Sequence, residues 1–546
     1  MRVALAQLNP TVGDLEGNRR LVEEAAAKAA SERAELVVLP EMVITGYPPM
    51  DLLERDGFVR DQLRQVDALL PASQRIPIAL GAVLPAPGRR PLRLENAVLL
   101  LAGGRRLASR AKTLLPSYDV FDERRYFAPA RRREPVVLGG HSLGLTVCED
   151  TWVHEIGYSV DPIAELSAAG AGLVLNLSAS PWHVGKAGER RQMIAALSRR
   201  HAVPIAFLNQ VGGNDELIFD GNSFVSDAAG RVIAALPAFD PAFAVVEVEA
   251  GAPALPEAEL ASDPAAELEE GLVLGIRDYF RKQGLPPGAV VGLSGGIDSA
   301  VTAHLAARAL GPDRVLGVLM PGPFSSEHSV EDALALGRNL GIALRRIDIQ
   351  PIYEAYLAVF RRLFGERDDY GVAQQNIQSR IRGALLMAIS NAEGRLVLAT
   401  GNKSELSIGY CTLYGDTVGG LAVLGDVYKR EVYALACRAN AAGPRIPQRS
   451  IDKAPSAELA PGQVDSDDLP PYEVLDAILS QAIEGGLGAS GIAPPPGATR
   501  AIVADVTRRL DRNEYKRRQS PLVLRTSRKA FGSGRRLPIV HRYLET

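Results

Sequence analysis

The sequence predicts an α/β protein with two large domains. Its 546 residues exceed what one hydrophobic core usually organises, since domains of roughly 100 to 200 residues are the norm. Short β-rich runs alternate with alanine-rich helical stretches over residues 1–250, and a strand, a glycine loop and a helix follow one another in the second half. Hydrophobic residues make up 47% and charged residues 23%, which excludes disorder over most of the chain.

The first predicted domain covers residues 1–250. Apolar runs of strand length recur there between helical stretches, which is typical of a layered α/β domain. The predicted strands are Val3–Leu8, Leu36–Leu39, Leu143–Val147, Leu173–Leu177 and Ile205–Asn209, and a helix is predicted over Leu21–Ala34.

A linker is predicted over 251–270, where prolines and acidic residues occur with little apolar periodicity. The second domain, 271–546, opens with a helical pattern at Gly271–Gln283. Three strands and two helices then follow in the order βαβαβ, which indicates an open, doubly wound parallel sheet. The predicted strands are Ala289–Leu293, Arg314–Met320 and Ala343–Asp348, and the second of the helices is Val330–Leu340.

Charge and cysteine content exclude several classes of protein. The formal net charge is -3, so no overall field favours nucleic acid or acidic membranes. The N-terminal apolar run is too short for a signal peptide, and no stretch approaches the roughly 20 apolar residues of a membrane span. Only Cys148, Cys411 and Cys437 occur, without metal spacing, which fits a reducing cytoplasm. We therefore expect a cytoplasmic protein with neither a nucleic-acid nor a membrane partner.

The segment SGGIDS, residues 294–299, lies between a buried-strand pattern and a helix, where free backbone N–H groups and the helix dipole favour an anion. Gly295 and Gly296 let the backbone approach a phosphate, and Ser294 and Ser299 can donate hydroxyls to it. The loop lacks the lysine of GxxxxGK[ST] and does not read GxGxxG, so transfer of a γ-phosphoryl group is not indicated. A phosphate site is predicted; the alternative is a tight turn without a ligand.

In this setting SGGIDS resembles the pyrophosphate loop of the N-type ATP pyrophosphatases, whose domain is adenine nucleotide α-hydrolase-like. The resemblance implies that ATP is cleaved between its α- and β-phosphates, that a substrate is adenylated, and that a nitrogen or sulfur nucleophile displaces AMP. It also implies that Asp298 helps to hold Mg²⁺, which neutralises charge on the leaving pyrophosphate.

Later segments resemble the ammonia-accepting domain of NAD synthetases. They are QNIQSRIRG from Gln375, GNKSEL from Gly401, GDTVGG from Gly415, KREVY from Lys429, KAPSAEL from Lys453 and DDLPPYEVLD from Asp467. By this resemblance Glu405 shares the metal with Asp298, and Thr400 joins the loop in binding ATP. The residues implied at deamido-NAD⁺ are Asn376, Arg380, Arg382, Glu405, Asp416, Lys429, Lys516 and Arg517. The ammonia-only enzymes carry a GTDHAAE-like sequence where this chain has GNKSEL, so Lys403 and Ser404 receive no implied role.

The C-terminal segment 512–546 is basic, with ten Lys or Arg residues against two acidic ones. Interleaved aromatic residues would suit RNA, but no recognisable RNA-binding module accompanies them. The stretch resembles the C-terminus of NAD synthetases of the glutamine-dependent type. Lys516 and Arg517 are therefore assigned to substrate phosphates, and a solvated tail is the alternative.

In the first half, Glu41, Lys112 and Cys148 each stand where a predicted strand gives way to a loop. The segments VLPEMVITGYPP, KTLLPSYDVFDERRYF, LTVCEDTW and NLSASPWH, in this order, resemble the carbon-nitrogen hydrolase (nitrilase) superfamily with its Glu-Lys-Cys triad and its α-β-β-α sandwich. Cys148 would attack an amide, Glu41 would exchange protons with it, and Lys112 would stabilise the oxyanion.

Further residues take roles from the same resemblance. Glu123 matches an additional glutamate of many nitrilase-type sites. Residues implied at the glutamine substrate are Tyr47, Tyr118, Ser178, Ser180 and Arg190. The choice between the two serines is open.

The two halves together resemble the glutamine-dependent NAD⁺ synthetase family. This resemblance implies that deamido-NAD⁺, ATP, glutamine and water give NAD⁺, AMP, pyrophosphate and glutamate, with ammonia passing through an enclosed tunnel, in a homo-oligomer of at least two chains. One alternative is another amidotransferase or a thiolating ATP pyrophosphatase that acts on RNA, with Cys411 or Cys437 as its cysteine. Another is a non-enzymatic sensor of NAD or ATP, which would be expected to lack some of the triad or loop residues that are present.

Overall fold

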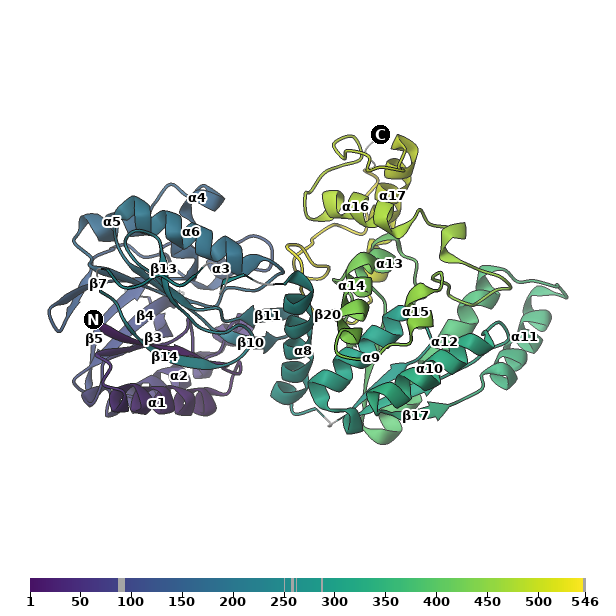
Figure 1. Ribbon diagram of the computed structural model, residues 1–546, viewed down its shortest axis with the longest axis horizontal. Coiled ribbons are helices and arrows are strands. Elements are labelled where there is room, and N and C mark those ends of the chain that lie inside the picture. The colour runs from purple at the N-terminus through teal and green to yellow at the C-terminus, as the bar shows by residue number, and fades with distance from the viewer. Residues whose placement is uncertain (87–93, 250, 257–259, 262, 286–287, 544–546) are drawn as a thin grey trace. The chain divides into compact units, whose positions relative to one another are not determined.

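The computed structural model describes residues 1–86, 94–249, 251–256, 260–261, 263–285 and 288–543. The chain divides into two compact units, residues 1–262 and 263–546 (Figure 1). Within the described residues no helix is long and apolar enough to cross a membrane.

Unit 1 contains two six-stranded sheets. The first has the order β14-β1-β2-β3-β4-β5, and the second has the order β13-β12-β9-β8-β7-β6. Strands of the first sheet are β1 Arg2–Gln7, β2 Leu36–Val38, β3 Ile78–Pro85, β4 Leu94–Ala102, β5 Arg105–Ala111 and β14 Ala242–Glu247. Strands of the second are β6 Val136–Leu138, β7 His141–Val147, β8 Leu173–Ser178, β9 Ile205–Asn209, β12 Phe224–Ser226 and β13 Val232–Ala235, and a separate hairpin is formed by β10 Val211–Asn214 and β11 Leu217–Asp220.

Strand alternation explains the layers of unit 1. Val3 and Leu5 of β1 pack with Leu145 of β7 in a core between the two sheets, whereas Ala4 of β1 faces outward against Val22 in the first helix. In the second sheet, Phe207 of β9 faces helix α6 in the same manner. The helices and helical turns are α1 Leu15–Ser31, η1 Met50–Glu54, α2 Asp56–Ala68, η2 Ala72–Gln74, α3 Glu123–Tyr126, η3 Cys148–Thr151, α4 Val153–Ile156, α5 Pro162–Ala168 and α6 Lys186–His201.

Figure 1 shows α1 and α2 on one outer side of the strands of unit 1 and α5 and α6 on the other. Strands β1, β2 and β3 are parallel, as are β7, β8 and β9. This arrangement confirms the α-β-β-α sandwich and gathers several loops at the carboxyl ends of the parallel strands.

Unit 2 contains one parallel six-stranded sheet with the order β17-β16-β15-β18-β19-β20. The chain therefore winds outward in one direction from β15 and then returns to add strands on its other side, which confirms the doubly wound prediction. The strands are β15 Ala289–Gly292, β16 Val315–Leu319, β17 Ala343–Arg346, β18 Leu396–Ala399, β19 Leu421–Ala422 and β20 Leu522–Val523. In such sheets, ligands bind outside the carboxyl ends of the strands where the winding reverses, here between β15 and β18.

Helices cover the sheet of unit 2. They are α8 Pro264–Gln283, α9 Ile297–Leu310, α10 Glu327–Leu340, α11 Gln350–Phe364, α12 Val372–Glu393, α13 Lys403–Ile408, α14 Lys429–Asn440, α15 Gln448–Asp452, α16 Tyr472–Ile483, α17 Arg500–Arg512 and α18 Glu514–Arg517, with short turns η4 Pro312–Arg314 and η5 Asp465–Asp467. Val290 of β15 packs with Ile381 of α12 in one core, and a second core joins α13, α16 and α17.

Two helices begin six or seven residues before their predicted starts, and the other boundaries differ by three residues or fewer. Helix α8 begins at Pro264, inside the predicted linker 251–270, because the Asp263 side chain accepts a hydrogen bond from the Ala265 N–H and proline suits the first helical position. Residues 250, 257–259 and 262 lie outside the described residues. Helix α1 begins at Leu15, before the predicted Leu21, with the Asp14 side chain accepting from Gly17 N–H.

Candidate active sites

In unit 1, strand ends bring Glu41 and Lys112 into contact. Glu41 follows β2 closely and Lys112 directly follows β5, which runs in the same direction as β3 because two antiparallel pairings separate them. The Lys112 Nζ donates to Glu41 Oε1 at 3.0 Å, and the two side chains are 1% and 0% exposed. Cys148 directly follows β7, and the charges of Glu41 and Lys112 both shift the pKa of its thiol. The predicted triad therefore lies within mutual electrostatic reach.

Glu123 shares the buried ammonium. The Lys112 Nζ also donates to Glu123 Oε1 at 2.7 Å, and the Tyr47 hydroxyl donates to the same oxygen at 3.1 Å. Burial raises the pKa of Glu123 to about 7, and Glu41 adds to the rise while Lys112 opposes it. One ammonium thus serves two buried carboxyl groups, and Glu123 can hold a proton near neutral pH.

The environment of Cys148 keeps its thiol protonated. Burial raises its pKa well above the usual range, and the negative charge of Glu41 raises it further. Its backbone has φ +39°, in the left-handed region that side-chain-bearing residues seldom adopt. A nucleophile of this kind needs a neighbouring base, and Glu41 has the chemistry to accept the thiol proton.

Backbone and amide donors fix the Glu41 carboxylate. Asn96 Nδ2 donates to Oε1 at 2.6 Å, and the Ala179 N–H donates to Oε2 at 2.9 Å. Asp150 ties the neighbouring loops together, since its carboxylate accepts from the N–H groups of Thr113 and Leu114 at 2.9 Å and of Val147 at 3.0 Å. These contacts hold the base and the two loops in one geometry.

The residues predicted to bind glutamine fall into two groups. Tyr118 is 38% exposed, and its hydroxyl donates to Glu149 Oε1 at 2.9 Å. The polar groups of Ser178 and Arg190 already bind other residues inside the fold. The serine hydroxyl donates to Asn176 Oδ1 at 2.6 Å, and the guanidinium forms a buried ion pair with Asp220.

Ser180 and Tyr47 are also buried. The Ser180 N–H donates to Asn209 Oδ1 at 2.8 Å. Desolvation and the charge of Glu123 raise the pKa of the Tyr47 phenol well above its usual range, so it remains a hydrogen-bond donor.

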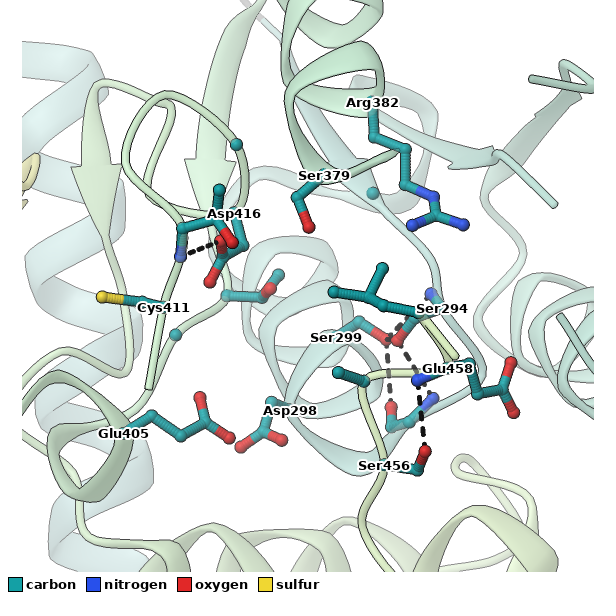
Figure 2. A pocket seen from close by; sticks show the side chains of 18 of the residues that line it. Ser294, Asp298, Ser299, Ser379, Arg382, Glu405, Cys411, Asp416, Ser456 and Glu458 are labelled. Carbon is teal, nitrogen blue, oxygen red and sulfur yellow. Dashed lines mark hydrogen bonds between the residues drawn. The ribbon is translucent and has the colours of Figure 1, made fainter. Parts of the chain in front are cut away.

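In unit 2, a cavity of about 460 Å³ lies at the carboxyl ends of β15, β16 and β18 (Figure 2). Most of the residues predicted for the synthetase site line it: Ser294, Gly296, Asp298, Ser299, Asn376, Arg382, Thr400, Glu405, Asp416, Lys429 and Lys516. These residues come from loops and helices up to 222 positions apart, from 294 to 516, and the sheet brings them around one space.

The glycine loop turns tightly into α9. Gly295 has φ +76°, and a Cβ there would lie 2.3 Å from the Ser329 carbonyl oxygen, so only glycine fits. The Ser299 hydroxyl donates to the Gly296 carbonyl at 3.0 Å, and the Gly296 N–H donates to Ser294 Oγ at 3.2 Å. Gly296 is also the N-cap of α9, and N–H groups at a helix start of this kind can receive an anion.

Two carboxylates of the cavity wall face each other across a lysine. Figure 2 shows the side chains of Asp298 and Glu405 directed toward one another. The Lys429 Nζ lies 2.6 Å from Asp298 Oδ2 and 3.3 Å from Glu405 Oε1. Burial, then Asp298 and Asp465, raise the pKa of Glu405 to about 8, although Lys429 opposes this. The donors are carboxyl oxygens, the ligand type that suits a hard divalent cation such as Mg²⁺.

Arg382 and Lys516 bring positive charge to other parts of the wall. Arg382 Nε donates to the Met320 carbonyl at 3.0 Å, and burial lowers the pKa of its guanidinium to about 10, so it stays charged at neutral pH. The Lys516 Nζ donates to the carbonyls of Gly409 and Cys411 at 2.6 and 2.8 Å.

Asn376 and Asp416 are joined through one threonine. Asp416 Oδ1 accepts from the Thr412 N–H at 2.6 Å, and Asn376 Oδ1 accepts from the hydroxyl of the same threonine at 2.9 Å. Burial raises the pKa of Asp416 to about 6.

The structure places three predicted site residues behind the cavity wall. Gly295 shapes the loop from beneath, and its carbonyl accepts from Ser450 Oγ. Arg380 Nε donates to the Leu413 carbonyl at 3.2 Å. Arg517 is 6% exposed and donates to the Ser407 carbonyl and to the Glu514 carboxylate, so its charge serves the fold.

Comparison with known proteins matches one family to most of each unit. A family model described as carbon-nitrogen hydrolase matches residues 2–252, and one described as NAD synthase matches residues 268–520. Glutamine-dependent NAD(+) synthetases of Synechocystis sp. and Thermotoga maritima are 43% and 40% identical, covering 99% and 100% of this chain and 99% of each relative. This chain belongs to the glutamine-dependent NAD(+) synthetase family. A solved glutamine-dependent NAD⁺ synthetase from Acinetobacter baumannii, in complex with ADP, is 38% identical with TM-score 0.76 over 99% of this chain and 98% of its own.

This glutamine-dependent NAD(+) synthetase family member has site residues that the sequence alone did not indicate. Asn96 has no local signal, because it lies inside β4 and meets Glu41 only through sheet pairing. The sequence signal that could have indicated Asp150 is its position, two residues after Cys148. In unit 2, Ser379, Lys453 and Glu458 also line the cavity. They lie in the segments from Gln375 and Lys453 that resemble NAD synthetases, but the resemblance gave them no individual role.

Proposed function

We propose that unit 2 converts deamido-NAD⁺ and ATP to NAD⁺, AMP and pyrophosphate with ammonia, and that unit 1 releases this ammonia from glutamine. The observation that carries the proposal is the presence of two complete sets of groups. Glu41, Lys112 and Cys148 form a buried amide-hydrolysing set, and the loop 294–299 stands beside the Asp298 and Glu405 carboxylates.

At the glutaminase site, Cys148 Sγ attacks the carbonyl carbon of the glutamine amide as Glu41 takes the thiol proton. The Lys112 ammonium, held by Glu41 and Glu123, stabilises the negative charge that develops on the carbonyl oxygen. Glu41 returns the proton to the leaving nitrogen, so ammonia departs and a thioester remains. Glu41 then activates water, which hydrolyses the thioester to glutamate and restores the thiol.

Substrate glutamine is proposed to contact Tyr118 and Ser180. The partial exposure of Tyr118 supports this role. Ser180 is preferred over Ser178, because the hydroxyl hydrogen of Ser178 is already donated to Asn176. Arg190 would act by positioning Asp220 and the surrounding loops, and Tyr47 by orienting Glu123.

At the synthetase site, the nicotinate carboxylate of deamido-NAD⁺ attacks the α-phosphorus of ATP and pyrophosphate leaves. Ammonia then attacks the adenylated carbonyl carbon and AMP leaves. The N–H groups of α9 and the hydroxyls of Ser294 and Ser299 would receive the pyrophosphate, with Thr400 beside them. Asp298 and Glu405 would hold Mg²⁺, which supplies positive charge for the departing pyrophosphate.

Deamido-NAD⁺ is proposed to lie along Asn376, Arg382, Asp416 and Lys516, all on the cavity wall. Lys429 would balance the charge of the two carboxylates when substrates bind. We leave Arg380 and Arg517 out of this set because of their internal contacts.

We further propose that ammonia passes between the sites through an enclosed path, that the chain forms at least a homodimer, and that it works in the cytoplasm. The first rests on chemistry, because ammonia protonates in bulk water near neutral pH. The cytoplasmic location is supported by the three free cysteines, since disulfides are rare in a reducing compartment. A thiolating reaction is disfavoured, since the chain is similar over its whole length to glutamine-dependent NAD(+) synthetases.

Paired assays on the full chain test the assignment. With deamido-NAD⁺, ATP, Mg²⁺ and ammonium, the chain should form NAD⁺, AMP and pyrophosphate in equal amounts, and Asp298→Asn should lower this rate sharply. Asp313→Asn, at an exposed position, is the matched control. Cys148→Ala should abolish synthesis from glutamine and retain synthesis from ammonium, whereas Cys437→Ala should retain both. Loss of both activities in Cys148→Ala, or full activity in Asp298→Asn, would remove the assigned roles.

A further inference from the structure

Two histidines and an aspartate gather among the outer helices of unit 1. His154 lies on α4, Asp161 is the N-cap of α5, and His201 is the last residue of α6. One ligand atom from each lies within 4.8 Å of the other two. Three helices thus supply two imidazoles and one carboxylate to a single point.

The spacing of these atoms suits a metal better than hydrogen bonds. Asp161 Oδ2 lies 3.5 Å from His154 Nε2 and 3.4 Å from His201 Nε2. Good hydrogen bonds between such groups are about 2.7–3.2 Å long. Tetrahedral zinc has bonds of about 2.0–2.1 Å, which place neighbouring ligand atoms about 3.3–3.4 Å apart. Two edges of the triangle therefore match a tetrahedral site.

One ligand nitrogen of the cluster lacks a partner, and other contacts hold the residues that carry the ligands. His201 Nε2 is buried and has no hydrogen-bond partner within the part of the chain that the structure describes. Asp161 Oδ1 accepts from the Ala164 N–H at 2.9 Å, which fixes the carboxylate and leaves Oδ2 for a further partner. Ser167 Oγ donates to the His201 carbonyl at 2.9 Å and joins α5 to the end of α6. A cation would find two of its three ligands already oriented.

Arg200 is the competing cation. Its guanidinium contacts His154 Nε2, so this nitrogen faces a donor and presents its lone pair. Arg200 is exposed at the end of α6 and can turn into solvent. A bound metal would take its place at His154.

We propose that His154, Asp161 and His201 bind one transition-metal ion of the Zn²⁺ or Co²⁺ type, with water completing the coordination. Two imidazoles with one carboxylate suit such ions, whereas Mg²⁺ prefers the all-oxygen pair Asp298 and Glu405. The ion would clip α4 to α5 and α6. This site is separate from the synthetase chemistry and does not depend on it.

The clip has a structural consequence for the glutaminase segment. Helix α4 begins at Val153, directly after Trp152 and the turn that carries Cys148. The Trp152 ring also receives the Lys186 ammonium of α6 at 3.8 Å. A metal that joins α4 to α6 would therefore restrain the chain that follows the nucleophile.

Cobalt titration of the full chain tests the proposal. Metal-free protein is titrated with Co²⁺ in excess Mg²⁺, which fills sites made of oxygen ligands. We expect one Co²⁺ per chain with the intense visible absorption of a tetrahedral ion. In Asp161→Asn the new residue is still a good helix cap. The variant should weaken Co²⁺ binding at least about tenfold, because loss of a contact that merely supports a ligand already weakens metal binding by that much, and here the ligand itself is lost. His154→Ala, at a position 44% exposed, should weaken it similarly without affecting folding.

His141→Ala is the matched control, since His141 is 43% exposed and lies outside the cluster. This variant should bind Co²⁺ as the unaltered chain does, and Arg200→Ala should bind it more tightly. Three results would overturn the proposal: unchanged affinity in both Asp161→Asn and His154→Ala, a near-ultraviolet thiolate band that assigns the ion to a cysteine, or only the weak spectrum of octahedral Co²⁺.

Discussion

Replacing Lys112 by methionine removes the one ammonium between two buried carboxyl groups. Methionine fills the space of the aliphatic stem but leaves Glu41 and Glu123 without the cation that lies 3.0 and 2.7 Å from their oxygens. Breaking a buried ion pair in this way costs about 3–5 kcal/mol, since an uncompensated charge stays behind. The glutaminase rate should fall by about 10²–10³, the loss expected when one oxyanion donor is removed.

The pH dependence of the variant has a definite sign. The pKa of Glu123 is already raised to about 7, from an ordinary value of 4.5, and the Lys112 charge is the largest influence that opposes the rise. A carboxyl whose folded pKa is raised contributes most stability at low pH, and the stability is lost as pH rises from the unfolded to the folded pKa. Without Lys112 the folded pKa rises further, so the loss should extend above pH 7.

Tryptophan fluorescence measures this in the full chain, because both tryptophans, Trp152 and Trp182, are buried in unit 1. Urea unfolding followed by this signal should show the loss in Lys112→Met, and Lys112→Met/Glu123→Gln should recover about 1–3 kcal/mol by removing one of the two charges. Lys28→Met, at an exposed position of α1, is the control. A loss under about 1 kcal/mol, with no recovery in the double variant, would refute the shared-ammonium reasoning.

Three further predictions concern unit 2. Gly295→Ala should raise the KM for ATP at least about tenfold, because φ +76° and the 2.3 Å approach to Ser329 force the loop to move, and an unchanged KM would contradict this. Lys516→Ala should raise the KM for deamido-NAD⁺, whereas Arg517→Ala should lower the melting temperature; the reverse pattern would place Arg517 in the site. Since the pKa of Glu405 is raised to about 8, its ionisation should destabilise unit 2 as pH rises between about 4.5 and 8. Mg²⁺ should therefore raise the melting temperature more at about pH 9 than at about pH 6, and Glu405→Gln should abolish the difference.

Much of the fold and of both sites could be predicted because strand ends are visible in a sequence. Glu41 and Cys148 each follow an apolar run, whereas Lys112 follows the mixed polar and apolar strand Arg105–Ala111. The sheets place the ends of such strands at common edges. The loop 294–299 could also be predicted, because its glycines lie between a strand and a helix. Local pattern marked positions at the ends of elements, and the resemblance to known families supplied their catalytic roles.

Contacts between distant segments could not be predicted in this way. Asn96 meets Glu41 through the pairing of β3 with β4, and nothing in its neighbourhood marks it. Lys516 and Arg517 are adjacent, yet successive residues on a helix point about 100° apart. Lys516 therefore lines the cavity, whereas Arg517 is buried against Glu514. The basic composition of the segment does not distinguish the two residues, and so the sequence prediction assigned both to substrate phosphates.

Nitrogen tracing tests the central claim, that glutamine hydrolysis in unit 1 supplies the amide made in unit 2. The full chain is given deamido-NAD⁺, ATP, Mg²⁺ and glutamine labelled with ¹⁵N at the amide, in a buffer with unlabelled ammonium, and the mass of the NAD⁺ is measured. The account predicts labelled NAD⁺ as the main product, and none of it from Cys148→Ala. NAD⁺ that is mostly unlabelled in the unaltered chain would contradict the transfer of ammonia, and absence of any NAD⁺ would contradict the assignment of unit 2.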